Sequence, residues 1–129
     1  LDATIIYWLL LRRWPGLIVA EEDGRLLGHV ITRLSVIGFP YKRGGISSIA
    51  VRPEYRRRGL ARRLMLAAID FLQASNARPI ELEVDVKNDA AINLYRSLGF
   101  TPGPTLHDYY GPGQNGMRMT LEQPDSPPE

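Results

Sequence analysis

The chain has 129 residues, 44% hydrophobic and 23% charged, which is the size and composition of one globular domain. It contains no cysteine, so disulfide bridges, a cysteine nucleophile and thiolate zinc sites are excluded. The two histidines, His29 and His107, are far apart in sequence, and we expect no metal site. The longest early apolar run, residues 5–11, is too short to span a membrane. With no targeting signal, we expect a cytoplasmic protein without a membrane partner.

The net charge of +2 is unevenly spread. Residues 52–63 hold six arginines and one glutamate, so this window carries +5 and the rest of the chain −3. One basic cluster on a slightly acidic body indicates one anionic ligand at one place. A nucleic-acid binder is usually basic over a whole face, so we expect no nucleic-acid partner.

Apolar periodicity and turn residues predict the first half of the chain. A helical pattern runs to Pro15-Gly16, which stops it. The pair Asp23-Gly24 is typical of a tight hairpin. In chain order we expect a helix over 1–14, strands over 17–20 and 26–34, a loop over 38–45 and a strand over 46–51.

The second half contains two amphipathic helices. Asn88 is a good N-cap for the second helix, and Gly99 is a good stop after it. We expect helices over 60–74 and 89–98, strands over 80–86, 101–105 and 117–121, a loop over 108–116 and a disordered tail over 124–129. This order predicts one α/β domain, residues 1–123, with a mixed, mostly antiparallel sheet flanked by helices.

A basic turn joins the strand that ends at Val51 to the helix that begins near Leu60. A helix start exposes unpaired N–H groups and a partial positive charge. Gly59 and Ala61 are small, so a phosphate can approach the main chain closely. The segment therefore predicts a phosphate or pyrophosphate cradle. A solvated arginine-rich turn is the plain structural alternative.

Two further segments carry groups that can move protons. Glu81, Glu83 and Asp85 share one face of their strand, about 6.6 Å apart in steps of two residues. An ordinary wet strand face accounts for Glu81 and Asp85, but crowding of carboxylates can make one of them a general base. Tyr95, on the second helix, is either a residue at the edge of the core or a proton donor.

These segments together resemble the GNAT superfamily of acetyl-coenzyme A-dependent N-acetyltransferases. Arg56-Arg57-Arg58-Gly59-Leu60-Ala61 is similar to its coenzyme signature, (Q/R)-x-x-G-x-(G/A). Residues 88–100 are similar to its next motif, N-x-x-A-x-x-L-Y-x-x-x-G-F. Within the superfamily, Leu82-Glu83-Val84 twelve residues before Tyr95 and the pair Tyr109-Tyr110 most resemble the protein N-terminal (N-alpha) acetyltransferases. The resemblance covers about residues 17–121.

The resemblance implies direct acetyl transfer from acetyl-CoA, as co-substrate and without a metal, to a primary amine. It implies Glu83 as base, directly or through a water, Tyr95 as acid, and Tyr109 and Tyr110 as substrate-binding residues. The implied coenzyme-binding residues are Ile49, Ala50, Val51, Arg56, Arg57, Arg58, Gly59, Leu60, Ala61, Arg62 and Asn88. The expected acceptor is the α-amine of a protein or peptide. A polyamine, amino acid or drug is the alternative, and a non-catalytic RNA- or coenzyme-binding module is a remote one.

The chain departs from the N-terminal acetyltransferase pattern at two places. Gly113-Gln114-Asn115-Gly116 stands where that branch often has Gly-Glu-Asp-Ala. A strand and a helix usually precede the first hairpin, whereas residues 1–16 leave room only for a helix. The chain also opens with Leu1 rather than Met. We therefore expect an N-terminally truncated domain that lacks part of one wall of the acceptor site.

Overall fold

A computed structural model of the chain describes residues 3–8, 16–35 and 42–122. Seven strands form one sheet in the order β1-β2-β3-β4-β5-β7-β6, in which only the β4–β5 pairing is parallel. The elements are β1 Thr4–Trp8, β2 Gly16–Glu22, β3 Arg25–Ser35, β4 Lys42–Val51, the 3-10 turn Pro53–Tyr55, α1 Leu60–Ala74, β5 Ala77–Asp85, α2 Asp89–Ser97, β6 Thr101–Gly111 and β7 Gln114–Leu121. The predicted mixed, mostly antiparallel α/β domain is confirmed.

The hairpin and both helices lie where the sequence places them. Asp23 and Gly24 have positive φ angles of 51° and 75°, which suits the tight turn that matches strand twist. The bounds of α1 are those predicted. Its apolar stripe packs on the sheet, and Leu64, Met65 and Leu72 on it are fully buried. Burial of each such side chain stabilises the fold by about 1.5–3 kcal/mol.

The helix predicted over residues 1–14 is wrong for Thr4–Trp8, which pair antiparallel with β2. Thr4, Ile5 and Ile6 are β-branched and are followed by two aromatic residues, a composition that favours strands. A short apolar run cannot be assigned by periodicity alone, and the edge of β2 decides it here. A strand therefore does precede the hairpin. The rest of the predicted helix lies outside the described residues.

Two predicted loops are in part strand. Residues 42–45 belong to β4. Gly44 and Gly45 do not form a turn there; they leave room for the side chains of Ala77 and Arg33 on the adjacent strands. A Cβ at Gly44 would meet Ala77 Cβ at 2.8 Å. The loop over 108–116 is also shorter than predicted, since β6 continues to Gly111 and β7 begins at Gln114. The tail over 124–129 lies outside the described residues.

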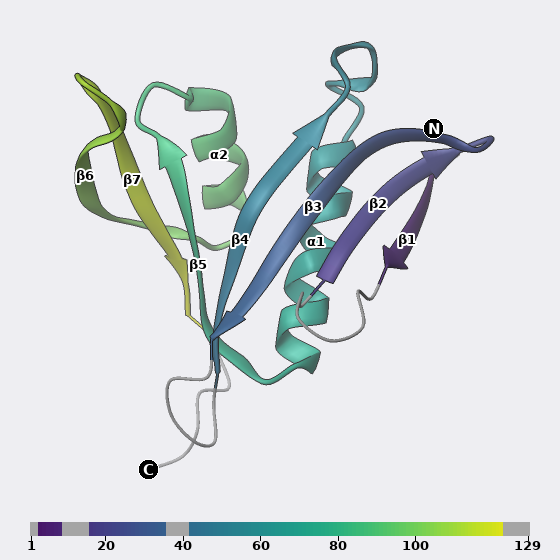
Figure 1. The fold of residues 1–129 in the computed structure, drawn as a ribbon, viewed down its shortest axis with the longest axis horizontal. Helices are drawn as coiled ribbons and strands as arrows, with labels where there is room; N and C mark the ends of the chain where they lie inside the picture. Colours follow the sequence, from purple (N-terminus) through teal and green to yellow (C-terminus); the bar gives the residue numbers. More distant parts are fainter. Residues whose placement is uncertain (1–2, 9–15, 36–41, 123–129) are drawn as a thin grey trace.

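The sheet opens between β4 and β5, as Figure 1 shows: the two strands meet at one end and diverge at the other, where α2 lies. Their pairing ends at Ile46 and Leu82. Pairing of β5 with β7 continues to Asp85. The last five residues of β4 therefore have an edge that no strand of the described residues covers. No helix in the described part of the chain is long and apolar enough to cross a membrane.

Candidate active site

A cavity of about 670 Å³ lies between the end of β4, the start of α1, and α2. It is lined by Ile49, Ala50, Val51, Tyr55, Arg56, Arg57, Gly59, Leu60, Ala61, Arg62, Asn88, Ala90, Ala91, Leu94 and Tyr95. Ten of the eleven residues predicted to bind the coenzyme are in this wall, together with the predicted acid. Analysis of the sequence missed Ala90, Ala91 and Leu94, although they lie inside the second motif.

The β4 wall presents main-chain groups to the cavity. The N–H of Arg52 donates to Leu27 O on β3, at 2.8 Å. Because alternate residues of an antiparallel strand turn their polar groups to opposite sides, Ile49 and Val51 turn theirs away from β3. Arg56 Nε donates to Val51 O at 3.0 Å. The arrangement fits an extended amide chain that lies beside β4.

The start of α1 fits a phosphate group. Gly59 caps the helix with φ 77° and without a side-chain hydrogen bond to the first turn. A Cβ built at this glycine meets no atom within 4 Å. Gly59, Leu60, Ala61 and Arg62 line the cavity, so the first N–H groups of α1, which have no partner within the helix, lie at its wall with the positive end of the helix dipole.

The arginines of the turn have separate partners. Arg57 and Arg62 line the cavity, and Arg62 Nη2 also donates to Ser97 Oγ at 2.7 Å, which ties α1 to the end of α2. Arg58, predicted to bind the coenzyme, does not line the cavity but lies over the Tyr55 ring, 5.8 Å from its centroid. Arg57, between them, has a left-handed backbone with φ 65°. A role for Arg58 in coenzyme binding stays a prediction.

Asn88 is the N-cap of α2, as predicted. Its Oδ1 accepts a hydrogen bond from the N–H of Ala91 at 3.2 Å. The oxygen is thus used by the helix, and the side-chain NH₂ is the group that can donate to a ligand in the cavity.

We expect Asn88→Ala to lower the free energy of unfolding by about 1 kcal/mol, the usual cost of a lost N-cap. Asn88→Asp keeps the accepting oxygen and should retain most of the stability. Urea denaturation of both variants checks this. Equal stability of the Ala and Asp variants would contradict the capping role.

Tyr95 lies on α2 with 7% of its surface exposed. Its ring meets Phe100 edge-on, at 6.1 Å between centroids. Burial, and secondarily the nearby Tyr110, raise the pKa of the Tyr95 phenol above its usual value of 10.0. The hydroxyl therefore keeps its proton at neutral pH, which a general acid requires.

The predicted substrate-binding tyrosines lie on β6 rather than in a loop. Their rings meet edge-on at 4.8 Å, and both are exposed. Both rings cover Gly116 of β7, where a Cβ would approach each within 3.2 Å. Burial raises the pKa of Tyr110, and Tyr109, Glu83 and Asp85 raise it further. Gly116 pairs with Asp85 of β5, so the two rings lie over the stretch of sheet that follows Glu83.

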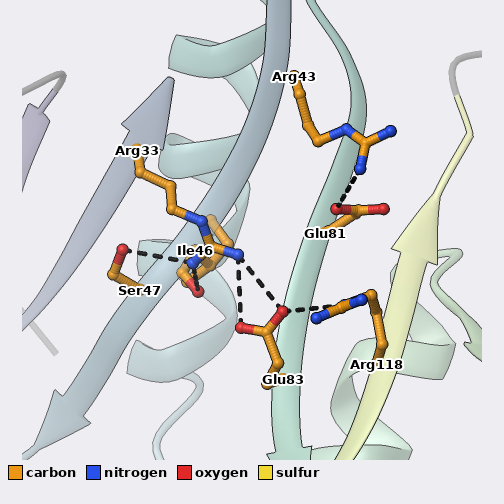
Figure 2. Close-up of polar contacts among 7 residues, drawn as sticks. All are labelled: Arg33, Arg43, Ile46, Ser47, Glu81, Glu83 and Arg118. Atoms are coloured by element: carbon orange, nitrogen blue, oxygen red, sulfur yellow. Dashed lines mark hydrogen bonds and ion pairs between the residues drawn. The ribbon is translucent and has the colours of Figure 1, made fainter. Parts of the chain in front are cut away.

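Glu83, the predicted base, is held by two arginines that analysis of the sequence missed (Figure 2). Arg33 Nη2 lies 3.4 Å from both carboxylate oxygens, and Arg118 Nε lies 3.2 Å from Oε2. A carboxylate offers about four acceptor positions, so about one remains, on Oε1. In the described ranges, no three His, Asp or Glu side chains gather as metal ligands do.

Known proteins resemble this chain in sequence and in structure. The model of the acetyltransferase (GNAT) family matches residues 1–100. N-alpha-acetyltransferase 30 of Schizosaccharomyces pombe is 34% identical over 117 residues, which are 90% of this chain and 78% of that protein. An N-alpha-acetyltransferase of Sulfurisphaera tokodaii is 37% identical over 110 residues, which are 78% of this chain and 65% of that protein.

Among solved structures, the NatC complex bound to Gag peptide and CoA superposes with a TM-score of 0.77 at 28% identity, over 83% of this chain and 70% of the matched one. The relatives and the matched structure are therefore longer than the part this chain spans. The family match covers well over half of the chain. The chain belongs to the acetyltransferase (GNAT) family.

Proposed function

We propose that the protein moves an acetyl group from acetyl-CoA to the N-terminal α-amine of a protein or peptide. The observation that carries this proposal is the cavity between β4, α1 and α2, which Tyr95 lines together with ten of the eleven residues predicted to bind the coenzyme. The names of the yeast and archaeal relatives support it. The matched structure, which holds both a peptide and CoA, supports it further.

The cavity fits the coenzyme in chemistry and in size. Its volume of about 670 Å³ is within the range of ligand pockets, about 300–1,000 Å³. The first N–H groups of α1 would hold the pyrophosphate, with Arg57 and Arg62 adding charge. Main-chain groups of Ile49 and Val51 would bond the pantetheine arm like a neighbouring strand. The coenzyme supplies the acetyl thioester.

Two side chains would manage the protons of a direct transfer. As the amine nitrogen bonds to the acetyl carbon and the carbon–sulfur bond breaks, Tyr95 donates its proton to the departing thiolate. Glu83 receives the amine proton through a water at the remaining acceptor position of Oε1. A peptide α-amine has a pKa near 8, against about 10.4 for lysine, so a weak base is sufficient.

The structure favours a peptide over the alternatives. A polyamine needs carboxylates that are free at the mouth of the site, but Glu83 is paired with two arginines, and Glu81 with Arg43 at 3.5 Å. An RNA-binding role needs a face that is basic throughout, whereas the basic charge gathers in residues 52–63 and the rest of the chain carries −3.

A peptide-library acetylation assay with mass readout tests the function. We expect peptides with free N-termini to gain about 42 Da, because an acetyl group replaces one hydrogen, and peptides with blocked N-termini to gain nothing. Spermidine and free amino acids serve as competing acceptors. Efficient acetylation of these small amines, with peptides ignored, would overturn the proposal.

Replacing both Tyr109 and Tyr110 by Phe should raise the KM for the peptide much more than the KM for acetyl-CoA. Paired hydroxyls over the sheet can bond the backbone amides that follow an α-amine, whereas neither ring lines the coenzyme cavity. Steady-state kinetics with each substrate varied in turn measures both constants. A rise confined to the KM for acetyl-CoA would contradict this assignment.

A further inference from the structure

The contacts of Glu83 leave positive charge on the open face of the sheet. The Glu83 side chain is 12% exposed, whereas those of Arg33 and Arg118 are 38% and 39% exposed. Two guanidinium groups thus share one carboxylate. By contrast, Arg43 of β4 and Glu81 of β5 form a one-to-one pair among the described residues. Figure 2 shows both groups side by side across β3, β4, β5 and β7.

Arg33 reaches Glu83 from two strands away because β4 lacks a side chain in its path. A Cβ at Gly45 would collide with the Arg33 side chain. Arg33 Nη1 is anchored on Ile46 O at 3.2 Å and on Ser47 Oγ at 3.4 Å. The guanidinium is therefore positioned before any ligand arrives.

Arg118 has donors to spare. In the described part of the chain its partner is Glu83, which it contacts through Nε alone. The two Nη groups of its planar fork remain. Such a fork matches the two oxygens of a carboxylate.

The cluster lies beside the candidate acceptor site. Arg118 and Gly116 are two residues apart on β7, so they face the same side of the sheet, about 6.6 Å apart. The Tyr109 and Tyr110 rings cover Gly116 on that side. An extended peptide advances about 3.3–3.6 Å per residue, so a group on the first or second residue of an acceptor held by the tyrosines reaches Arg118.

We propose that Arg33 and Arg118 form a carboxylate-binding site that selects acceptors with an acidic side chain at the first or second residue. This rests on the proposed peptide function and names its substrate class. The acidic side chain of the acceptor accepts hydrogen bonds from the Nη groups of Arg118. Its negative charge balances the one positive charge of the two arginines that Glu83 does not neutralise. The same charge disfavours a lysine at that position.

Acetylation kinetics on matched peptides test the inference. The peptides differ only in Glu, Gln or Lys at residue 2, and a second set varies residue 1. We expect kcat/KM to be at least about tenfold higher for Glu than for Gln, as hydrogen bonds between charged groups contribute about 1.5–3 kcal/mol. The Lys peptide should be the poorest. Equal values for the three peptides in both sets would overturn the inference.

Variants test whether Arg33 and Arg118 cause the preference for the Glu peptide over the Gln peptide. Arg118→Gln should reduce the Glu/Gln ratio to about one, an estimate that follows from loss of the charged fork. Gly45→Ala should also lower it, because the new methyl displaces the flexible Arg33 side chain without removing it. Arg43→Gln is the control, since it removes an arginine from the same face without touching Glu83, and the ratio should persist. A ratio unaffected by both Arg118→Gln and Gly45→Ala overturns the inference.

The design separates this inference from the proposed function. Acetylation of all peptides without regard to charge overturns the carboxylate site alone. Failure to acetylate any peptide, with acetyl-CoA binding intact by calorimetry, overturns the function and the inference together. Free glutamate and glutamine form a further arm. If free amino acids are acetylated in preference to every peptide, the carboxylate recognised is the α-carboxylate of an amino acid, and the peptide form of the proposal is wrong.

Discussion

Gly59→Trp is expected to abolish acetyl-CoA binding in a chain that still folds. Gly59 lines the cavity at the start of α1, where the N–H groups would meet the pyrophosphate, and a Cβ built at this glycine meets no atom within 4 Å. An indole there occupies the phosphate position. Isothermal titration calorimetry should detect no binding, and thermal unfolding should remain cooperative.

Gly24→Trp is the matched control. Gly24 has φ 75°, against 77° for Gly59, and a Cβ at Gly24 also meets no atom within 4 Å. Both substitutions therefore impose the same left-handed strain, about 1–2 kcal/mol, but Gly24 lies in the β2–β3 turn outside the cavity. The control should keep the wild-type Kd. If both variants bind acetyl-CoA as the wild type does, the phosphate cradle is wrong.

Predictions from the sequence succeeded where the signal is local. The cap at Asn88, the turn at Asp23-Gly24 and the stripe of α1 each depend on residues within a few positions of one another. The coenzyme wall is local too, because a strand end, a turn and a helix start are continuous in sequence. Arg58 does not line that wall but lies over the Tyr55 ring, a contact that the motif does not reveal.

Pairing between strands decided the features that the sequence did not reveal. Thr4–Trp8 became a strand because β2 offers an edge, and no pattern within the segment records that neighbour. Gly44 and Gly45 are typical of a turn when read alone. In the sheet they give room to Ala77 and to Arg33.

The partners of Glu83 show the same limit at the site itself. Arg118 lies directly opposite Glu83 in the β5–β7 register, so it could be identified only once that register was known. Arg33 comes from β3, 50 positions earlier in the chain. Proposing Glu83 as a base thus required only the motif, whereas its charge environment required the fold. The two arginines of that environment are the reason for proposing an acceptor that carries a carboxylate as well as an amine.

Tyr95→Phe should lower the rate of acetyl transfer by about 10²–10⁴-fold, the usual contribution of a general acid. The change removes only the hydroxyl, so the ring keeps its edge contact with Phe100 and the fold should persist. Single-turnover measurements are required, because slow product release would hide the loss. The Kd for acetyl-CoA, measured by calorimetry, should change little, since the first turn of α1 and the edge of β4 provide the expected contacts.

The pH dependence of the same step identifies the acid. An acid works only while it holds its proton, and burial raises the pKa of Tyr95 above 10.0. The wild-type rate should therefore not fall through loss of this proton between neutral pH and pH 10, and any such fall should come at higher pH and be absent from Tyr95→Phe. If the wild-type rate falls with a midpoint below pH 10 and this fall is absent from Tyr95→Phe, burial does not raise the pKa of Tyr95 as stated. Full single-turnover activity in Tyr95→Phe would mean that the thiolate leaves without a proton from Tyr95.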